Sequence, residues 1–133
     1  MLRDQDSAWS RGDVVGFSKH MADSFLAKNV QGQSMSGKAV FDRQHEFIFD
    51  GFFTGSKMTQ TIDTLRYLSK KTAFVETIVH VGNLTVPPAM WPLDSEGRLE
   101  TRLLQVFEKS GGRWSVVAFH NTIVNHCAPP MVS

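Results

Sequence analysis

Three histidines on separate segments are the residues of this chain best suited to acid–base chemistry. His45, His80 and His120 each lie in a stretch that is otherwise largely apolar. An imidazole titrates near neutral pH, so a histidine can act as a general base without a large change in its pKa. Asn121 and Arg102 carry N–H donors that can polarise a carbonyl group. The three histidines are therefore candidate catalytic residues.

Structural roles compete with this interpretation. A single histidine on an apolar face is usually a core residue that hydrogen-bonds to its surroundings. Glu76 could pair with Arg102 across a sheet, or could face water, as charged side chains on strands commonly do. Three histidines on three segments are harder to explain in this way than one, and both interpretations stay open.

A metal or cofactor site has little support in the sequence. The chain contains no His-x-His, no H-E-x-x-H and no pair of cysteines. Its one cysteine, Cys127, follows His126 in a segment with two prolines, which lacks the rigid setting that a nucleophile needs. P-loop, G-x-S-x-G and G-x-G-x-x-G motifs are also absent from the sequence. We predict no metal and no cofactor.

The composition is that of an ordinary globular domain. The chain has 133 residues, of which 41% are hydrophobic and 20% charged, enough for one domain with its own core. The net charge is +1 and the basic residues are scattered, which argues against nucleic-acid binding. The sequence shows neither a signal peptide nor the roughly 20 consecutive apolar residues of a membrane span. We predict a cytoplasmic protein that binds neither nucleic acid nor membrane.

The N-terminal part of the sequence predicts three helices and one short strand. Gly12 is a signal for a helix C-terminus, and Asp13 is a good N-cap for the segment that follows. Helical spacing places Phe41, His45 and Ile48 on one face of the third helix. Phe49 and Phe52 extend this face. The predicted elements are helices over 4–10, 14–23 and 38–53, a strand over 25–30 and a loop over 31–37.

The C-terminal part predicts an antiparallel sheet. Prolines keep the segment 85–97 out of any central strand, and Ser110-Gly111-Gly112 is a strong hairpin signal. Helices that are segregated from a meandering sheet define an α+β fold. The predicted strands cover 57–69, 72–84, 98–110 and 113–125.

Both faces of the predicted strand over 72–84 carry apolar residues, so both need a cover. The helices can cover one face, and a partner subunit or a ligand could cover the other. In the last strand His120 and Asn121 point to opposite faces, so they cannot both enter the same cavity unless a bulge intervenes. One face of the strand over 72–84 carries Phe74, Glu76, Ile78 and His80, and the other carries Val75, Thr77, Val79 and Val81.

Four segments together resemble the SnoaL-like superfamily, the nuclear transport factor 2-like group that includes ketosteroid isomerases and polyketide cyclases. They are WSRGD at 9–13, GKAVF at 37–41, FTGSKM at 53–58 and GGRWSVVAFHNT at 111–122. The chain is most similar to a branch of small uncharacterised proteins whose last strand ends in His-Asn-Thr. The resemblance implies one SnoaL-like domain over 1–133, with its core at about 9–124 and a tail at 125–133. It also implies a cone-shaped barrel, a curved antiparallel sheet wrapped around N-terminal helices.

A pocket between the concave sheet face and the helices is the functional implication of this resemblance. It would bind a small apolar organic ligand, and the protein could be a cyclase or isomerase acting on a polyketide- or steroid-like substrate. The stretch 25–37 has no Asp or Glu where ketosteroid isomerases carry their base, so an isomerase using that base is not expected. The expected ligand-binding residues are Phe41, Phe49, Glu76, Arg102 and Asn121.

Two further expectations concern assembly and His45. A homodimer through the sheet would cover its second apolar face, and a non-catalytic assembly or protein-interaction domain is the alternative function. We expect His45 to line the cavity and to approach a polar side chain of the sheet, from Glu76, His80, Arg102 or His120. The competing outcome is a hydrogen bond to a backbone carbonyl within the helical layer.

Overall fold

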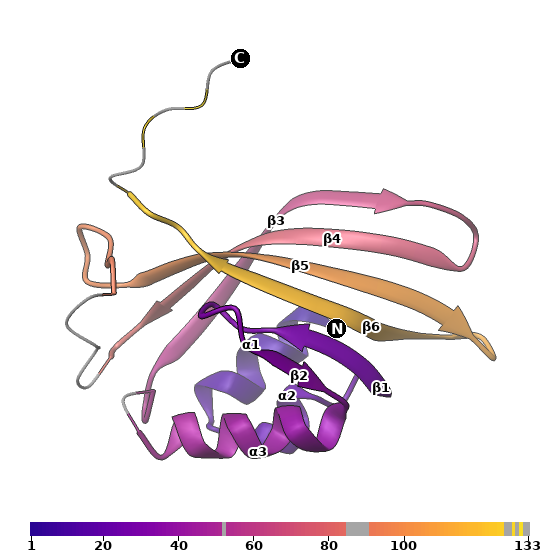
Figure 1. Ribbon diagram of the computed structural model, residues 1–133, viewed down its shortest axis with the longest axis horizontal. Coiled ribbons are helices and arrows are strands. Elements are labelled where there is room, and N and C mark those ends of the chain that lie inside the picture. Colours follow the sequence, from indigo (N-terminus) through magenta and orange to yellow (C-terminus); the bar gives the residue numbers. More distant parts are fainter. Residues whose placement is uncertain (52, 85–90, 127–128, 130, 132–133) are drawn as a thin grey trace.

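The computed structural model describes residues 1–51, 53–84, 91–126, 129 and 131 of the chain. Three helices lie on one side of a curved sheet (Figure 1), so the α+β class is confirmed. The helices are α1 (Leu2–Ser10), α2 (Val14–Phe17) and α3 (Lys38–Phe49). The strands are β1 (Met21–Lys28), β2 (Ser34–Ser36), β3 (Lys57–Tyr67), β4 (Thr72–Gly82), β5 (Leu99–Ser110) and β6 (Arg113–Ile123).

The six strands form one open sheet in the order β2-β1-β6-β5-β4-β3. Neighbouring strands are antiparallel except for β1 and β6, which are parallel. The expected curved sheet beside N-terminal helices is confirmed. The sheet stays open at its two edge strands, and the parallel pair of β1 and β6 makes it mixed instead of purely antiparallel. The direction of β1 escaped prediction because no hairpin joins it to β6, and only a hairpin forces the antiparallel arrangement.

One face of the sheet is buried beneath the helices. Along β4 the residues Ala73, Val75, Thr77, Val79 and Val81 are all buried, whereas their sequence neighbours are partly exposed. We call the buried side, which faces the helices, the inner face, and the opposite side the outer face. The β5 residues at odd positions from Leu99 to Phe107 are buried in the same way, because strand side chains alternate between faces.

Helix α1 is held on the inner face by polar side chains. The amides of Gln5 and Gln105 exchange hydrogen bonds of 2.8 and 3.1 Å, although both residues are almost fully buried. Gln60 Nε2 donates to Gln5 Oε1 and to Asp6 Oδ1, and Thr77 Oγ1 donates to Gln60 Oε1 at 2.9 Å. We call Gln5, Gln60, Thr77 and Gln105 the polar belt. Its hydrogen bonds fix the position of α1 across three strands.

The predicted helix over 14–23 is one turn long. Asp13 caps it as expected, because its carboxylate accepts a hydrogen bond from the backbone N–H of Gly16. The chain then leaves the helix after Phe17, and β1 begins at Met21, where the backbone N–H of Val116 donates to the carbonyl of His20. Pairing with β6 outweighs the helical spacing of Val14, Phe17 and Met21, and all three side chains are still buried in the core.

Two other boundaries differ from the expectation. The predicted loop over 31–37 contains the short strand β2, which pairs with β1 through Ser34, Met35 and Ser36. Helix α3 ends at Phe49 instead of continuing to residue 53, and Thr54 accounts for this end because its hydroxyl donates to the carbonyl of Phe49. Phe52 and residues 85–90 of the predicted loop lie outside the described residues.

No described helix is long and apolar enough to cross a membrane. The cytoplasmic location stays a prediction from the sequence.

Candidate functional site

A cavity of about 350 Å³ lies between the helices and the inner face of the sheet. Its walls are mainly aromatic and aliphatic, and they come from both layers: Trp9 from α1, Phe17 from α2, Ile48 from α3, and Val79 and Phe119 from the sheet. Trp9 is held by a hydrogen bond of 2.9 Å from its Nε1 to Ser56 Oγ. A pocket of this size and character is typical of small-molecule sites.

The polar side chains that line the cavity are uncharged. The described lining residues include no Asp, Glu, Lys or Arg, and the polar ones are Asn29, Gln31, Gln44, His45, Thr101 and Asn121. Thr101 and Asn121 belong to the floor, on strands β5 and β6, whereas Gln44 and His45 project from α3. The cavity therefore offers hydrogen bonds to a ligand, but the described lining offers no counter-charge.

His45 is buried among aromatic rings at the side of the cavity. Its ring centroid lies 3.9 Å from that of Phe41 and 5.3 Å from that of Phe17. Burial lowers the pKa of His45 to about 4, against the opposing effect of its hydrogen bond to Phe41. Because an uncharged ring is favoured, the imidazole is neutral at pH 7.

The hydrogen bond of His45 determines its tautomer. Nδ1 lies 2.8 Å from the backbone carbonyl oxygen of Phe41, which can only accept a hydrogen bond. Nδ1 therefore carries the proton, and Nε2 of the neutral ring is an acceptor. Towards a ligand, His45 acts as an acceptor and a weak base.

Thr101 and Asn121 place two unpaired polar atoms at the cavity. Thr101 Oγ1 and Asn121 Oδ1 are both buried, and no hydrogen-bond partner for either atom exists among the described residues. Leu103 pairs with Asn121 and Thr101 pairs with Ile123, so the two polar residues are diagonal neighbours on the inner face. A buried polar atom without a partner costs about 1–3 kcal/mol, and such atoms are rare in folded proteins.

The structure separates the predicted site residues into two groups. His45 and Asn121 line the cavity, while Phe41 and Phe49 pack against the His45 ring from outside the lining. Phe41 is fully buried behind His45.

The other four predicted residues lie on the outer face. Glu76 and His80 alternate with the buried residues of β4, Arg102 pairs with Ile78, and His120 pairs with Leu104. The expectation that His45 meets one of these four side chains is wrong, and its bond to Phe41 is the competing outcome. The physical reason is that side chains alternate between the two faces of a strand. Both faces of β4 carry apolar residues, and the helices cover the face that has no charged side chains.

Thr101 is the cavity residue that the sequence analysis missed. A signal was present, because Thr101 and Gln105 interrupt an apolar inner row of β5 that includes Leu99, Leu103 and Phe107. A polar residue at an inward position needs a partner. Gln105 finds one in the polar belt, whereas Thr101 does not find one among the described residues.

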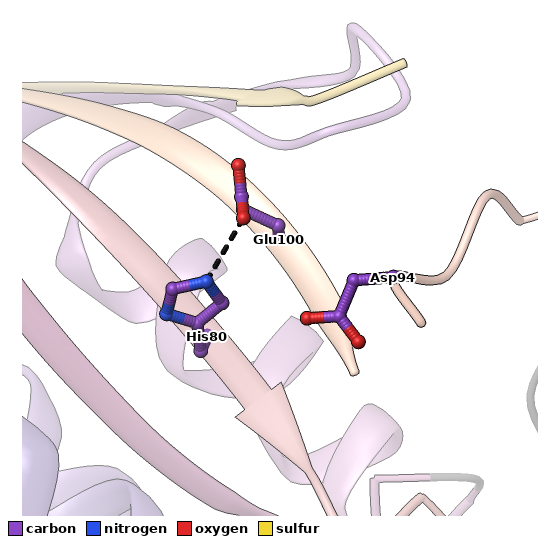
Figure 2. A group of neighbouring side chains, drawn as sticks. All are labelled: His80, Asp94 and Glu100. Atoms are coloured by element: carbon purple, nitrogen blue, oxygen red, sulfur yellow. Dashed lines mark hydrogen bonds and ion pairs between the residues drawn. The ribbon is translucent and has the colours of Figure 1, made fainter. Parts of the chain in front are cut away.

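The outer face carries a second cluster of polar groups, shown in Figure 2. His80 and Glu100 are cross-strand neighbours, with 2.9 Å between His80 Nε2 and Glu100 Oε1. The side chain of Asp94 points towards the same region from the loop before β5. One ligand atom from each of these three residues lies within 4.8 Å of the others, a spacing that could suit a divalent cation.

Protein contacts already account for this outer cluster. Burial would raise the pKa of Asp94, but hydrogen bonds from the backbone N–H groups of Arg98 and Glu96 and from the Arg98 side chain bring it below its usual value. Arg98 Nε lies 3.0 Å from Asp94 Oδ2, and Arg102 Nη1 lies 3.7 Å from Glu100 Oε2. A metal ion would compete with two guanidinium groups for both carboxylates.

Comparisons with known proteins identify the fold. No family model matches the sequence, and no curated protein shows significant sequence similarity to it. Similar solved structures exist. An uncharacterised protein with a cystatin-like fold from Caulobacter vibrioides has a TM-score of 0.79 at 21% identity, over 94% of this chain and 85% of that one.

Two further structures carry functional names. A ketosteroid isomerase-like protein from Erwinia carotovora atroseptica has a TM-score of 0.73 at 16% identity, over 92% of this chain and 90% of that one. A putative calcium/calmodulin dependent protein kinase II association domain from Xanthomonas campestris has a TM-score of 0.70 at 17% identity, over 92% and 81%. The chain therefore has the cystatin-like fold of the nuclear transport factor 2-like proteins, as the sequence resemblance predicted.

Proposed function

We propose that this protein binds a small apolar organic molecule in the cavity between the helices and the inner face of the sheet. The observation that carries this proposal is the pair of buried, unpaired polar atoms of Thr101 and Asn121 at an otherwise apolar cavity. A polar belt a short distance away on the same face is hydrogen-bonded internally, so the fold does not need unpaired polar groups there. A bound ligand would supply the hydrogen-bond partners of these two atoms and would displace any water held there.

A cyclase or isomerase acting on a polyketide- or steroid-like substrate is the catalytic form of this proposal. Because the described lining contains no carboxylate, a proton removed from a substrate would go to Nε2 of His45. A base with a pKa of about 4 removes protons only from an acidic carbon, such as one between two carbonyl groups. Asn121 would hold the substrate. We place binding before catalysis because the cavity supports binding without any assumption about the reaction.

The test of binding uses two neighbouring leucines on opposite faces of β5. Leu103 lines the cavity, whereas Leu104 belongs to the outer face. Titration of the protein with small aromatic ketones and phenols, followed by intrinsic tryptophan fluorescence and native mass spectrometry, should give saturable one-to-one binding. Leu103→Phe should abolish binding by filling the cavity, and Leu104→Phe should leave it unchanged. Equal effects of the two variants, or no binding of any probe to the unmodified chain, would refute the proposal.

The second candidate function is assembly through the outer face, which fits the similarity to an association domain. Phe74, Ile78, Leu104, Val106 and Ala118 share the outer face of the central strands, as the strand register requires. Glu76, Arg102 and His120 lie among these apolar side chains on the same face. A partly apolar sheet face of this kind is a common dimer surface. We propose a homodimer in which two outer faces pack together around a twofold axis.

Light scattering at micromolar concentration measures this directly. The dimer proposal expects twice the chain mass for the unmodified protein and the single mass for Ile78→Glu. Leu103→Phe is the matched control, because its change lies on the inner face and should leave the dimer intact. A single mass for the unmodified protein would rule the dimer out. If Ile78→Glu destroys a cellular phenotype that Leu103→Phe leaves intact, assembly is the function and ligand binding is not.

A further inference from the structure

We propose that the ligand is a neutral molecule with a hydroxyl group, and that Thr101 and Asn121 hold this hydroxyl against the sheet. This inference rests on the proposed binding function and specifies the chemistry of the ligand.

The neutrality of the ligand follows from the lining. The described part of the cavity wall contains no ionisable side chain other than His45, which is uncharged at neutral pH. A charged ligand would lose its hydration on entry without meeting an opposite charge, at a cost of several kcal/mol. A carboxylate or ammonium group is therefore disfavoured at the buried floor that Thr101 and Asn121 form.

The hydroxyl follows from the two unpaired atoms. Asn121 Oδ1 is an acceptor, and Thr101 Oγ1 can donate one hydrogen bond and accept others. A ligand hydroxyl can donate and accept, so it can satisfy either residue. A carbonyl or ether oxygen cannot donate, and it would leave Asn121 Oδ1 unpaired. His45 adds a further acceptor at the cavity wall, through Nε2.

The remaining walls describe the rest of the ligand. Trp9, Phe17 and Phe119 supply aromatic surface around the polar floor, and Trp9 also packs against Phe53 with a ring-centroid distance of 5.3 Å. Such walls favour a flat or alicyclic hydrocarbon skeleton. The geometry points to a phenol or an alicyclic alcohol as the class of ligand.

A series of probes that differ only at the polar group tests the inference. The series is 2-naphthol, 2-methoxynaphthalene, naphthalene and 2-naphthoate, with phenol, anisole, toluene and benzoate as a smaller set. We expect the hydroxyl compound to bind about tenfold more tightly than its ether or hydrocarbon, which is the usual effect of one net hydrogen bond. The carboxylates should not bind.

Two variants connect the preference to the proposed residues. Thr101→Val and Asn121→Leu should each reduce affinity for the naphthol about tenfold while affinity for naphthalene stays level or rises. Thr101→Ser should retain the preference because it keeps the hydroxyl. Thermal unfolding of each variant without ligand confirms that the fold is intact, and Thr77→Val, outside the cavity lining, serves as a control that should leave the probe preference unchanged.

The outcomes separate the two proposals. Binding of naphthalene or the ether as tightly as the naphthol would overturn the hydroxyl inference and leave the binding function standing, because water trapped in the cavity would then satisfy both residues. Tightest binding of the carboxylates would overturn the claim of neutrality. Failure of every probe in both sets would overturn the binding function and the inference together.

Discussion

Two buried polar regions on the inner face of the same sheet behave in opposite ways. In the polar belt, Gln5 and Gln105 satisfy each other, and Thr77 donates to Gln60. At the cavity floor, Thr101 is as deeply buried as Thr77, with 1% and 0% exposure, but has no hydrogen-bond partner among the described residues. Two threonines with the same burial therefore differ in whether the fold itself completes their hydrogen bonds.

This difference distinguishes polar groups whose hydrogen bonds stabilise the fold from polar groups that are free to bind a ligand. A satisfied buried hydrogen bond contributes to stability and specifies how α1 sits on the sheet. An unsatisfied one lowers stability, so its retention requires another benefit, and binding is the benefit that an adjacent apolar cavity offers. Each of the following predictions tests this separation.

The largest effect is expected from pH, through His45 at the edge of the cavity. Burial lowers the pKa of His45 from 6.5 to about 4, so as pH falls the unfolded chain binds a proton at His45 before the folded chain does. The free energy of unfolding should therefore decrease by about 3 kcal/mol between pH 7 and pH 4, because the two pKa values of His45 lie in this range. Urea unfolding at a series of pH values measures it.

The matched variant for this measurement is His45→Leu, which should flatten the pH dependence in the same window. Asp6 acts with the opposite sign, because burial raises its pKa despite two hydrogen bonds from Gln60. The stabilising contribution of Asp6 to the free energy of unfolding is present below its pKa in the unfolded chain. It is lost as pH rises through its pKa in the folded protein. An unchanged slope in the His45→Leu variant would show that another group controls acid stability.

The next effect is on the polar belt. Gln105→Leu removes both hydrogen bonds between Gln105 and Gln5 and leaves a buried amide on α1 without these partners. We expect a loss of about 2 kcal/mol of unfolding free energy, in the range for an unsatisfied buried amide. Chemical denaturation gives the value. A neutral effect would mean that α1 does not depend on the belt for its position.

A pair of equivalent substitutions gives the sharpest form of the comparison. Thr77→Val should destabilise the protein by about 1 kcal/mol because it breaks a satisfied hydrogen bond, and Thr101→Val should stabilise it by a similar amount because it removes an unsatisfied group. The two variants are compared by melting temperature without ligand. If both shift the melting temperature in the same direction, the two regions are not different in kind.

The smallest effect is expected on the outer face. His80→Gln replaces one member of the cross-strand pair with Glu100, and pairs on a partly exposed sheet face contribute about 0.5 kcal/mol. It should leave ligand binding unchanged, because His80 is not part of the cavity lining. A large loss of binding would show that the outer face communicates with the cavity.

The sequence predicted the fold better than the site. Alternation along β4, the glycine hairpin before β6 and the Asp13 cap are local signals, and each was confirmed. The start of β1 and its parallel pairing depend on a strand far away in the sequence, and local helical spacing concealed them. For the site, alternation separated Glu76 and His80 from Val79 correctly, but it could not say which of two apolar faces the helices would cover.

Thr101 illustrates the other limit of the sequence. It was one of several threonines in strands, where threonine is common for reasons of conformation. Its importance comes from the missing partner, and Thr77 shows that a partner can come from a strand or helix distant in sequence. Whether a buried hydroxyl is satisfied is a property of the assembled core.

The parallel pairing of β1 with β6 has a consequence for synthesis on the ribosome. Phe25 and Ala27 on β1 are almost fully buried, yet β6, against which their strand is aligned, is the last strand of the sheet to be made. Until β6 emerges, β1 can pair with β2 only, and a row of apolar side chains stays accessible. Contacts between segments so far apart slow folding and prolong exposure to aggregation. Recovery of native protein should therefore depend on chaperones that hold the nascent chain until β6 has left the ribosome.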